Sequence, residues 1–396
     1  MSQRPLTLWL IGVAILMVAC GSTSVQSATS SPTAIEGDGS AVRGTSAEPS
    51  PTFTVGPAGD RASPAPTSEA DCTSDPAPVF SHHYTDLDQV DFINPTIVTS
   101  GNWLKNRQYH KVVTDAQNNA PEVPLYAPAD AVATGVTYYL GQMMSWEGEG
   151  FGLGQYEVRF QVSCEVTFGF DHISRLAEPF ASLAPVEPSQ TTRDAEVPVS
   201  VEVGAGQLIG WTSGTEPAHT WDFIVSNSST PNEFANQARY EGAADLVTLL
   251  HASCPYDYFE PELADAYRAK FGNWQGRAAH AGCGLSPDVP GSLAGGWFLS
   301  PYDPNAGMAL TEWGLVATLA ADGYLDLNGP GVALRIAHTD PSFLDPASMT
   351  GEHCYVHYQG NQWGYVALLS DSELAAAFGQ GNCPASLPSE HQVFYR

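Results

Sequence analysis

Histidine and carboxylate side chains are the residue types through which this chain could bind a metal or transfer protons. His353 and His357 lie four residues apart, but the residues Cys354-Tyr355-Val356 between them favour a strand. On a strand these histidines would share a face about 13 Å apart, too far to bind one ion. His82 and His83 lie near three aspartates, but that segment lacks the glycine and the closing glutamate of a calcium loop. Both histidine pairs are therefore predicted to be structural.

Charge and motif content exclude several function classes. The 15 Lys and Arg residues against 43 Asp and Glu residues give a net charge of −28, and no basic cluster suits a phosphate backbone. We therefore expect no nucleic-acid partner and interpret the acidity as solubility outside the cell. The sequence contains no G-x-S-x-G, H-E-x-x-H or P-loop motif, and its cysteines lack C-x-x-C spacing.

Three segments resemble, in the same order, three parts of one peptidase family. Val123–Gly135 reads VPLYAPADAVATG, in which Pro128 separates two short apolar runs and interrupts a strand ladder. Val162–Leu176 reads VSCEVTFGFDHISRL, and Val201–Val225 ends in PAHTWDFIV. These segments are similar to the lysostaphin-type M23 metallopeptidases over roughly residues 100–230. The resemblance implies an M23-like antiparallel β-sheet or β-barrel-type domain and a zinc-dependent peptidase site.

The resemblance also implies a ligand set for zinc, and this chain departs from it. His110 and Asp115, in the segment NRQYHKVVTD, stand for two of the family's ligands, although Asp115 falls one residue late. The family has a zinc-binding histidine where this chain has Trp221, whose indole nitrogen can only donate a hydrogen bond. Asp222 is the substitute ligand nearby, but on a strand it projects to the opposite face. Because catalytic zinc needs three protein ligands and a water, the sequence predicts a degenerate site, with zinc as the cofactor that a complete site would bind.

The function that follows from this resemblance is a non-catalytic cell-envelope module that binds a glycan or a peptide. The alternative is an active zinc endopeptidase that cleaves peptidoglycan peptides, in which His172 would stabilise the oxyanion and His219 would be the general base. A third interpretation is a carbohydrate- or peptide-binding cleft lined by Trp146, Trp211 and Trp221. Whether the chain is an enzyme is left open by the sequence.

The composition indicates a mainly β protein in two domains. Gly (37) and Pro (30) are plentiful and charged residues make up 15%, which favours turn-rich β architecture. The 396 residues exceed one typical domain, so an M23-like domain at 72–250 and a smaller β-rich domain with short helices at 251–396 are expected. Helices are predicted at Pro261–Phe271 and Ser370–Phe378, and residues 243–250 as a helix or a buried strand. Successive strands are predicted at Gly291–Leu299, Met308–Leu319, Gly323–Leu327, Val332–Ala337, His353–Tyr358 and Trp363–Leu369.

The N-terminal part has the pattern of an exported lipoprotein. Residues 1–20 combine a basic start, an apolar run and Met17-Val18-Ala19-Cys20, which resembles a bacterial lipobox with Cys20 as the lipidated residue. Residues 21–71 are rich in Ser, Thr and Pro and predict a disordered tether. We expect the protein on the outer face of the cell membrane, held by a lipid anchor, with plain secretion as the alternative.

The other six cysteines are an even set suited to three disulfides in an oxidising compartment. Six cysteines allow fifteen pairings, and the sequence does not decide among them. The nearest-neighbour choice, which keeps each bridge within a domain, is Cys72–Cys164, Cys254–Cys283 and Cys354–Cys383.

Overall fold

The computed structural model describes residues 72–145, 148–189, 196–216, 218–273, 276–277, 283, 288–307, 312–320 and 322–396. The predicted leader and tether, with Cys20, lie outside the described residues, as does Trp146. The described residues, from 72 onwards, belong to one compact unit, and the division into two domains remains a prediction. Strands predominate, which confirms the mainly β class. No helix within the described ranges has the length and apolar character needed to cross a bilayer.

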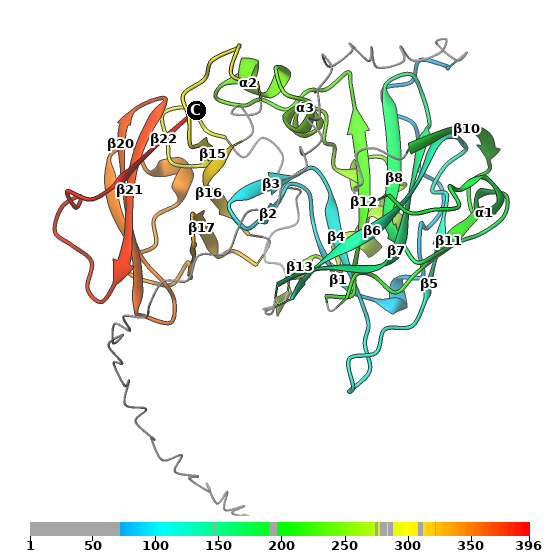
Figure 1. Ribbon diagram of the computed structural model, residues 1–396, viewed down its shortest axis with the longest axis horizontal. Helices are drawn as coiled ribbons and strands as arrows, with labels where there is room; N and C mark the ends of the chain where they lie inside the picture. Colours follow the sequence, from blue (N-terminus) through cyan, green and yellow to red (C-terminus); the bar gives the residue numbers. More distant parts are fainter. Residues whose placement is uncertain are drawn as a thin grey trace, which may run out of the picture. The chain divides into compact units, whose positions relative to one another are not determined.

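Seven antiparallel strands form the first sheet, in the order β1-β4-β12-β8-β7-β6-β10 (Figure 1). Their bounds are β1 Val90–Asn94, β4 Gln108–Val112, β12 Thr220–Asn227, β8 Val166–Ile173, β7 Gly148–Gln161, β6 Ala131–Ser145 and β10 Glu196–Val203. A separate three-stranded sheet has the order β5-β11-β9, with β5 at Val123–Tyr126, β11 at Leu208–Thr212 and β9 at Arg175–Leu176. A small hairpin joins β2 Val98–Ser100 to β3 Trp103–Lys105, and another joins β13 Gly272–Asn273 to β14 Gly276–Arg277.

The two faces of the seven-stranded sheet differ in character because successive side chains on a strand alternate between faces. On β12, Trp221 and Phe223 are fully buried in an apolar core that also contains Phe170 of β8. We call this side of the sheet the core face. Asp222 of β12 and Asp171 of β8 project to the other side, which we call the polar face.

The core face is covered by short helices and by the chain before β1. Helix α4, Pro261–Arg268, begins at a proline, which suits the first turn of a helix, and confirms the helix predicted there. Its Tyr267 ring stacks on Tyr84 with the centroids 4.3 Å apart. Residues 254–271, which the sequence pattern assigns to the C-terminal domain, therefore contribute to the first core. The other helices are α1 Phe180–Leu183, α2 Gln237–Glu241, α3 Ala244–Leu250, η1 Leu87–Gln89, η2 Pro255–Asp257 and η4 Pro346–Ser348.

An eight-stranded antiparallel sheet, in the order β18-β17-β16-β15-β22-β21-β20-β19, forms most of the C-terminal part. Its strands are β15 Gly295–Phe298, β16 Trp313–Leu319, β17 Leu325–Gly329, β18 Val332–Ile336, β19 Glu352–Val356, β20 Gln362–Ser370, β21 Glu373–Gln380 and β22 Gln392–Tyr395. The amide of Tyr358, just after β19, donates to the carbonyl oxygen of Arg335 on β18 at 2.8 Å, so the sheet nearly closes on itself. The strands predicted in this part are confirmed where described; residues 308–311 of one of them lie outside the described residues.

The helix predicted at Ser370–Phe378 is wrong. Ser370 ends β20, and Glu373–Gln380 forms strand β21, which pairs with β20 on one side and β22 on the other. The alanines of this segment favour a helix in isolation, but hydrogen bonding to two neighbouring strands outweighs that propensity. Leu374 and the three alanines that follow are all buried, so both faces of this strand are covered.

Three disulfides are present and follow the nearest-neighbour pairing. Cys72–Cys164 ties the start of the described chain to the turn before β8, across a sequence separation of 92. Cys254–Cys283 and Cys354–Cys383 each span 29 residues. Bridges of this kind persist in oxidising compartments.

Candidate functional site

His110, predicted as a metal ligand, lies on the core face of the first sheet. It is directly opposite Trp221 in the pairing of β4 with β12, so the two side chains share a face. Both are fully buried, and their rings stack with centroids 4.2 Å apart. The Nε2 atom of His110 lies 2.6 Å from the hydroxyl oxygen of Tyr84. Trp221 therefore fills the core beside His110. A side chain at this position points into the core and cannot reach a metal bound on the polar face.

Burial lowers the pKa of His110 to about 3, so the ring is neutral at neutral pH. As the pH falls from about 6.5 towards 3, the unfolded chain takes up a proton that the folded chain does not bind, and the folded state loses stability. At pH 4.5 this one group is expected to lower the free energy of unfolding by about 2–3 kcal/mol relative to pH 7. His110→Gln should remove that part of the pH dependence in urea denaturation at the two pH values. His391→Gln, at an exposed histidine, is the control; equal pH dependence in all three proteins would contradict the assignment.

Asp115, the second predicted ligand, lies in an exposed loop after β4. Its carboxylate accepts hydrogen bonds from the backbone amides of Gln117 and Asn119 at 2.9 and 2.8 Å and so holds the loop together. A hydrogen bond from the Asn119 side chain, together with these backbone bonds, lowers the pKa of Asp115. The structure does not bring His110, Asp115 and Asp222 to one point, because His110 and Asp222 are on opposite faces of the sheet.

Asp222 and Asp171 meet on the polar face. They are directly opposite each other in the pairing of β12 with β8, and both are almost completely buried. Arg107, the residue before β4, places its Nη1 atom 2.8 Å from Asp222 Oδ2 and 3.4 Å from Asp171 Oδ2. One guanidinium nitrogen therefore bridges two buried carboxylates, which reduces the cost of burying both charges.

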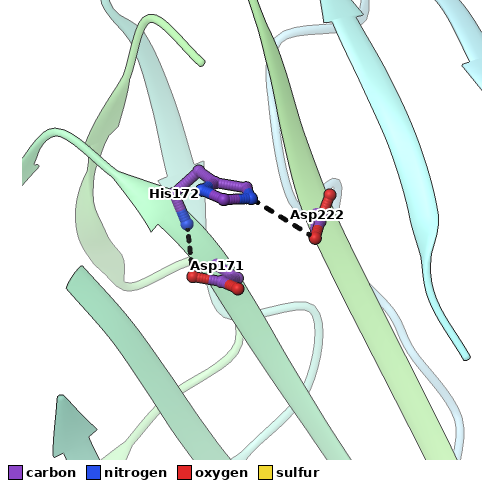
Figure 2. Close-up of side chains that lie close together, drawn as sticks. All are labelled: Asp171, His172 and Asp222. Carbon is purple, nitrogen blue, oxygen red and sulfur yellow. Dashed lines mark hydrogen bonds and ion pairs between the residues drawn. The ribbon is translucent and has the colours of Figure 1, made fainter. Parts of the chain in front are cut away.

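His172 joins this pair because β8 bulges there. In the pairing of β7 with β8, Asp171 and His172 together face the single residue Glu157, and His172 has a φ of 65°. Such a bulge redirects a side chain that regular alternation would send to the opposite face. Figure 2 shows the imidazole turned towards Asp222, with His172 Nε2 3.6 Å from Asp222 Oδ2. The backbone amide of His172 donates to Asp171 Oδ1 at 2.7 Å.

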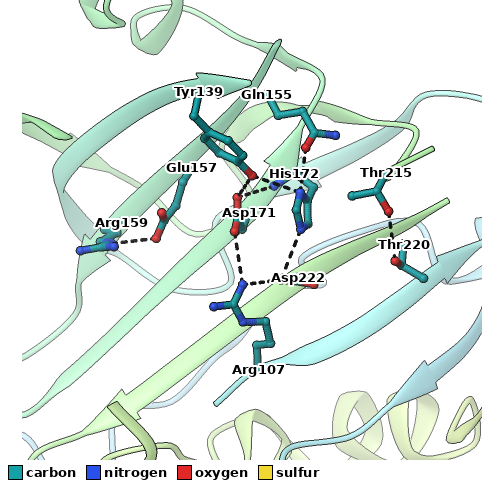
Figure 3. A network of polar contacts seen from close by, with 10 residues as sticks. All are labelled: Arg107, Tyr139, Gln155, Glu157, Arg159, Asp171, His172, Thr215, Thr220 and Asp222. Atoms are coloured by element: carbon teal, nitrogen blue, oxygen red, sulfur yellow. Dashed lines mark hydrogen bonds and ion pairs between the residues drawn. The ribbon is translucent and has the colours of Figure 1, made fainter. Parts of the chain in front are cut away.

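A second set of polar side chains surrounds His172 and Asp171 (Figure 3). His172 Nδ1 lies 2.8 Å from the amide oxygen of Gln155 and 3.0 Å from the hydroxyl of Tyr139. That hydroxyl also donates to Asp171. We call Arg107, Asp171, His172 and Asp222 the polar-face cluster. Its side chains reach solvent at His172, which is 22% exposed, and at Arg107, which is 25% exposed.

Burial and charge act on the two carboxylates in opposite directions. Burial raises the pKa of Asp222, and the neighbouring Asp171 adds to that effect, while His172 and Arg107 oppose it. Burial likewise works against ionisation of Asp171, but His172, Arg107 and the hydrogen bonds it accepts outweigh it and lower its pKa. One negative charge is therefore firmly held at Asp171, and the guanidinium lies between it and Asp222.

The donor atoms of the cluster suit a metal, but the arginine does not. Asp171, His172 and Asp222 each offer a ligand atom, and these atoms lie within 4.8 Å of one another. One imidazole nitrogen and two carboxylate oxygens are ligands that zinc accepts. The Nη1 atom of Arg107, however, is in contact with one oxygen of each carboxylate. A dication would meet the positive charge of Arg107, which is partly buried, at close range, so the residues present do not fit zinc while Arg107 is in place.

His219 lies in the turn between β11 and β12, with its Nδ1 atom 3.3 Å from the carbonyl oxygen of Ser213. The turn requires Gly214, whose φ is +73° and where a Cβ atom would lie 2.3 Å from the carbonyl carbon of His219. His219 is not part of the metal-capable group found among the described residues. Of the predicted site residues, the structure thus brings together His172 and Asp222, and adds Asp171 and Arg107.

Arg107 and Asp171 are the members that the sequence did not single out. Asp171 directly precedes His172, but only the bulge in β8 places both on one face. Arg107 is 115 residues from Asp222 along the chain, and charge alone did not distinguish it from other arginines. Alternation continued from β4 back to the residue before it, which puts Arg107 opposite in face to His110, is the signal that could have found it.

The predicted aromatic cleft is not assembled from the tryptophans that are described. Trp221 is fully buried in the first core. Trp211 on β11 is covered by the guanidinium of Arg175, whose carbon atom lies 3.6 Å from the ring centroid.

Comparisons with known proteins add one structural likeness. The fold and site define a β-rich protein with a buried ionic cluster on one face of an antiparallel sheet. No family model matches the chain, and no curated protein matches it. Among solved structures, the solution structure of lysostaphin is similar at 14% identity and a TM-score of 0.23, covering 65% of this chain and 87% of that one. A TM-score of this size carries no argument about fold or activity.

Proposed function

We propose that this protein is an M23-like cell-envelope module that binds a glycan or peptide without hydrolysing it. The observation that carries the proposal is the position of Arg107, whose guanidinium bridges the two carboxylates that a catalytic metal would need. His172 supports it, because its ring is partly exposed and its Nε2 atom, 3.6 Å from Asp222 Oδ2, is beyond hydrogen-bond distance there and can form a hydrogen bond with a ligand.

Binding to cell-wall material and its turnover can be measured on the same protein. We expect the purified chain to co-sediment with peptidoglycan and to leave peptidoglycan peptides intact, with or without stoichiometric zinc. His172→Ala should weaken co-sedimentation, whereas His391→Ala, at an exposed histidine remote in sequence, should not. Failure of the wild type to bind any cell-wall fraction would contradict the proposal.

A second candidate, a zinc endopeptidase acting on peptidoglycan peptides, is favoured by the close approach of Asp171, His172 and Asp222. Zinc at such a group would polarise a scissile carbonyl and activate water. Zinc-dependent cleavage of peptidoglycan peptides by the wild type, lost in Asp222→Asn, would establish this function in place of the first.

We also propose that the protein is exported and held at the membrane by a lipid on Cys20, outside the described residues. The three disulfides support an oxidising compartment. Cys20→Ala should move the protein from the membrane fraction to the soluble fraction, because a multiply acylated terminus is the stable anchor that the variant lacks. Fractionation followed by immunodetection measures this. Unchanged membrane association in the variant would point to an uncleaved N-terminal helix instead.

A further inference from the structure

The separation of the donor atoms in the polar-face cluster is that of ligands around a small cation. His172 Nε2 and Asp222 Oδ2 are 3.6 Å apart, and Asp171 contributes a further oxygen within 4.8 Å of both. Two ligands on a tetrahedral zinc ion are about 3.3 Å apart, given bond lengths near 2.0–2.1 Å. The separation of His172 Nε2 from Asp222 Oδ2 is therefore close to that of two zinc ligands, and the Asp171 oxygen lies within 4.8 Å of both.

The arginine occupies this place without satisfying the atoms around it. Arg107 uses Nη1 alone for both carboxylates, and not the two-nitrogen fork that usually binds one carboxylate. In consequence two buried atoms, Asp222 Oδ1 and Arg107 Nε, have no hydrogen-bond partner. Asp222 itself is 1% exposed. In this geometry the guanidinium contacts both carboxylates through a single nitrogen, as a metal ion would contact them through a single atom. One oxygen of Asp222 is left without a hydrogen-bond donor.

We propose that Arg107 is the resident cation of the polar-face cluster and that its charge keeps a divalent metal out of an otherwise complete donor set. The binding-only function proposed above rests on the same geometry, and this inference explains it: the ionic cluster is held together by an arginine in the position of a metal. The cluster without that charge should bind zinc through Asp171, His172 and Asp222.

Removal of the charge at position 107 is the direct test. We expect Arg107→Ala to bind zinc at least about 100-fold more tightly than the wild type in calorimetric titration, because a dication no longer meets the positive charge of the guanidinium. Zinc should also raise the melting temperature of this variant and leave that of the wild type unchanged. The gain should disappear in Arg107→Ala/Asp222→Asn, which removes one of the three donors.

Two matched variants separate charge from other effects. Arg107→Lys retains a cation at the same place and should bind zinc no better than the wild type. Arg159→Ala removes another guanidinium of the polar face, one that pairs with Glu157 and Glu196, and should leave zinc affinity within about threefold of the wild type. If the lysine variant gains affinity as the alanine variant does, charge is not what excludes the metal and the inference is wrong.

Loss of Arg107 leaves two buried carboxylates without a cation, so the alanine variant is also refolded from denaturant with zinc or with magnesium. Recovery of folded protein with zinc alone supports the inference; equal recovery with both ions, or none with either, overturns it. Tight zinc binding by the wild type would likewise overturn it.

These results are independent of the co-sedimentation assay, so a wild type that fails to bind peptidoglycan would contradict the proposed function without affecting the metal titration.

Discussion

Replacing Trp221 by Ala should lower the free energy of unfolding by about 3–5 kcal/mol, the loss typical of a large aromatic residue truncated inside a core. Trp221 is fully buried and contacts the rings of His110, Tyr84 and Phe170 on the core face of the first sheet. Urea denaturation of variant and wild type at pH 7 measures the difference.

Trp211→Ala is the matched control, because that ring lies on the small three-stranded sheet and is only partly buried beneath Arg175. Its effect should be clearly smaller. Trp221→His tests the ligand position directly: we expect a loss of stability and no gain in zinc affinity, since the imidazole would enter the core and not the polar face. A stable histidine variant with much tighter zinc binding would show that the strand faces are assigned wrongly.

Loss of the Cys72–Cys164 disulfide should lower the free energy of unfolding by about 4–5 kcal/mol, which the chain-entropy model gives for a loop of this length. The bridge spans 92 residues and joins the chain before β1 to the turn before β8. Cys72→Ser/Cys164→Ser, compared with the wild type by urea denaturation without reductant, measures the effect. Both cysteines are replaced so that no free thiol remains.

The bridge Cys354–Cys383 provides an internal comparison, because it closes a loop of only 29 residues. The same model predicts a loss of about 3.6 kcal/mol for Cys354→Ser/Cys383→Ser, roughly 1 kcal/mol less than for the longer loop. Thiol titration of the denatured, unreduced wild type should find none of the six cysteines of the three disulfides free. Six free thiols would contradict the oxidising compartment that we propose.

Local sequence signals predicted the secondary structure correctly where one strong conformational preference acts alone. Pro261 followed by an amphipathic pattern predicted helix α4, and alternating residues between turn signals predicted most strands of the C-terminal sheet. The segment Ser370–Phe378 shows the limit. Its capping pattern and alanines favour a helix, yet it has strands on both sides, and pairing with them decides its conformation.

The sequence by itself determined the β-rich class, indicated six cysteines suited to three disulfides, and included His172 and Asp222 among its candidate site residues. Only the tertiary structure decided which residues share a face. A strand shifted by one residue exchanges its two faces, so the pairing of β4 with β12 places His110 and Trp221 in the core and Arg107 beside Asp222. The bulge in β8 then adds His172 to the polar face. The pairing of β4 with β12 joins residues more than a hundred positions apart, and the bulge depends on how β8 pairs with β7, so neither is set within one local segment.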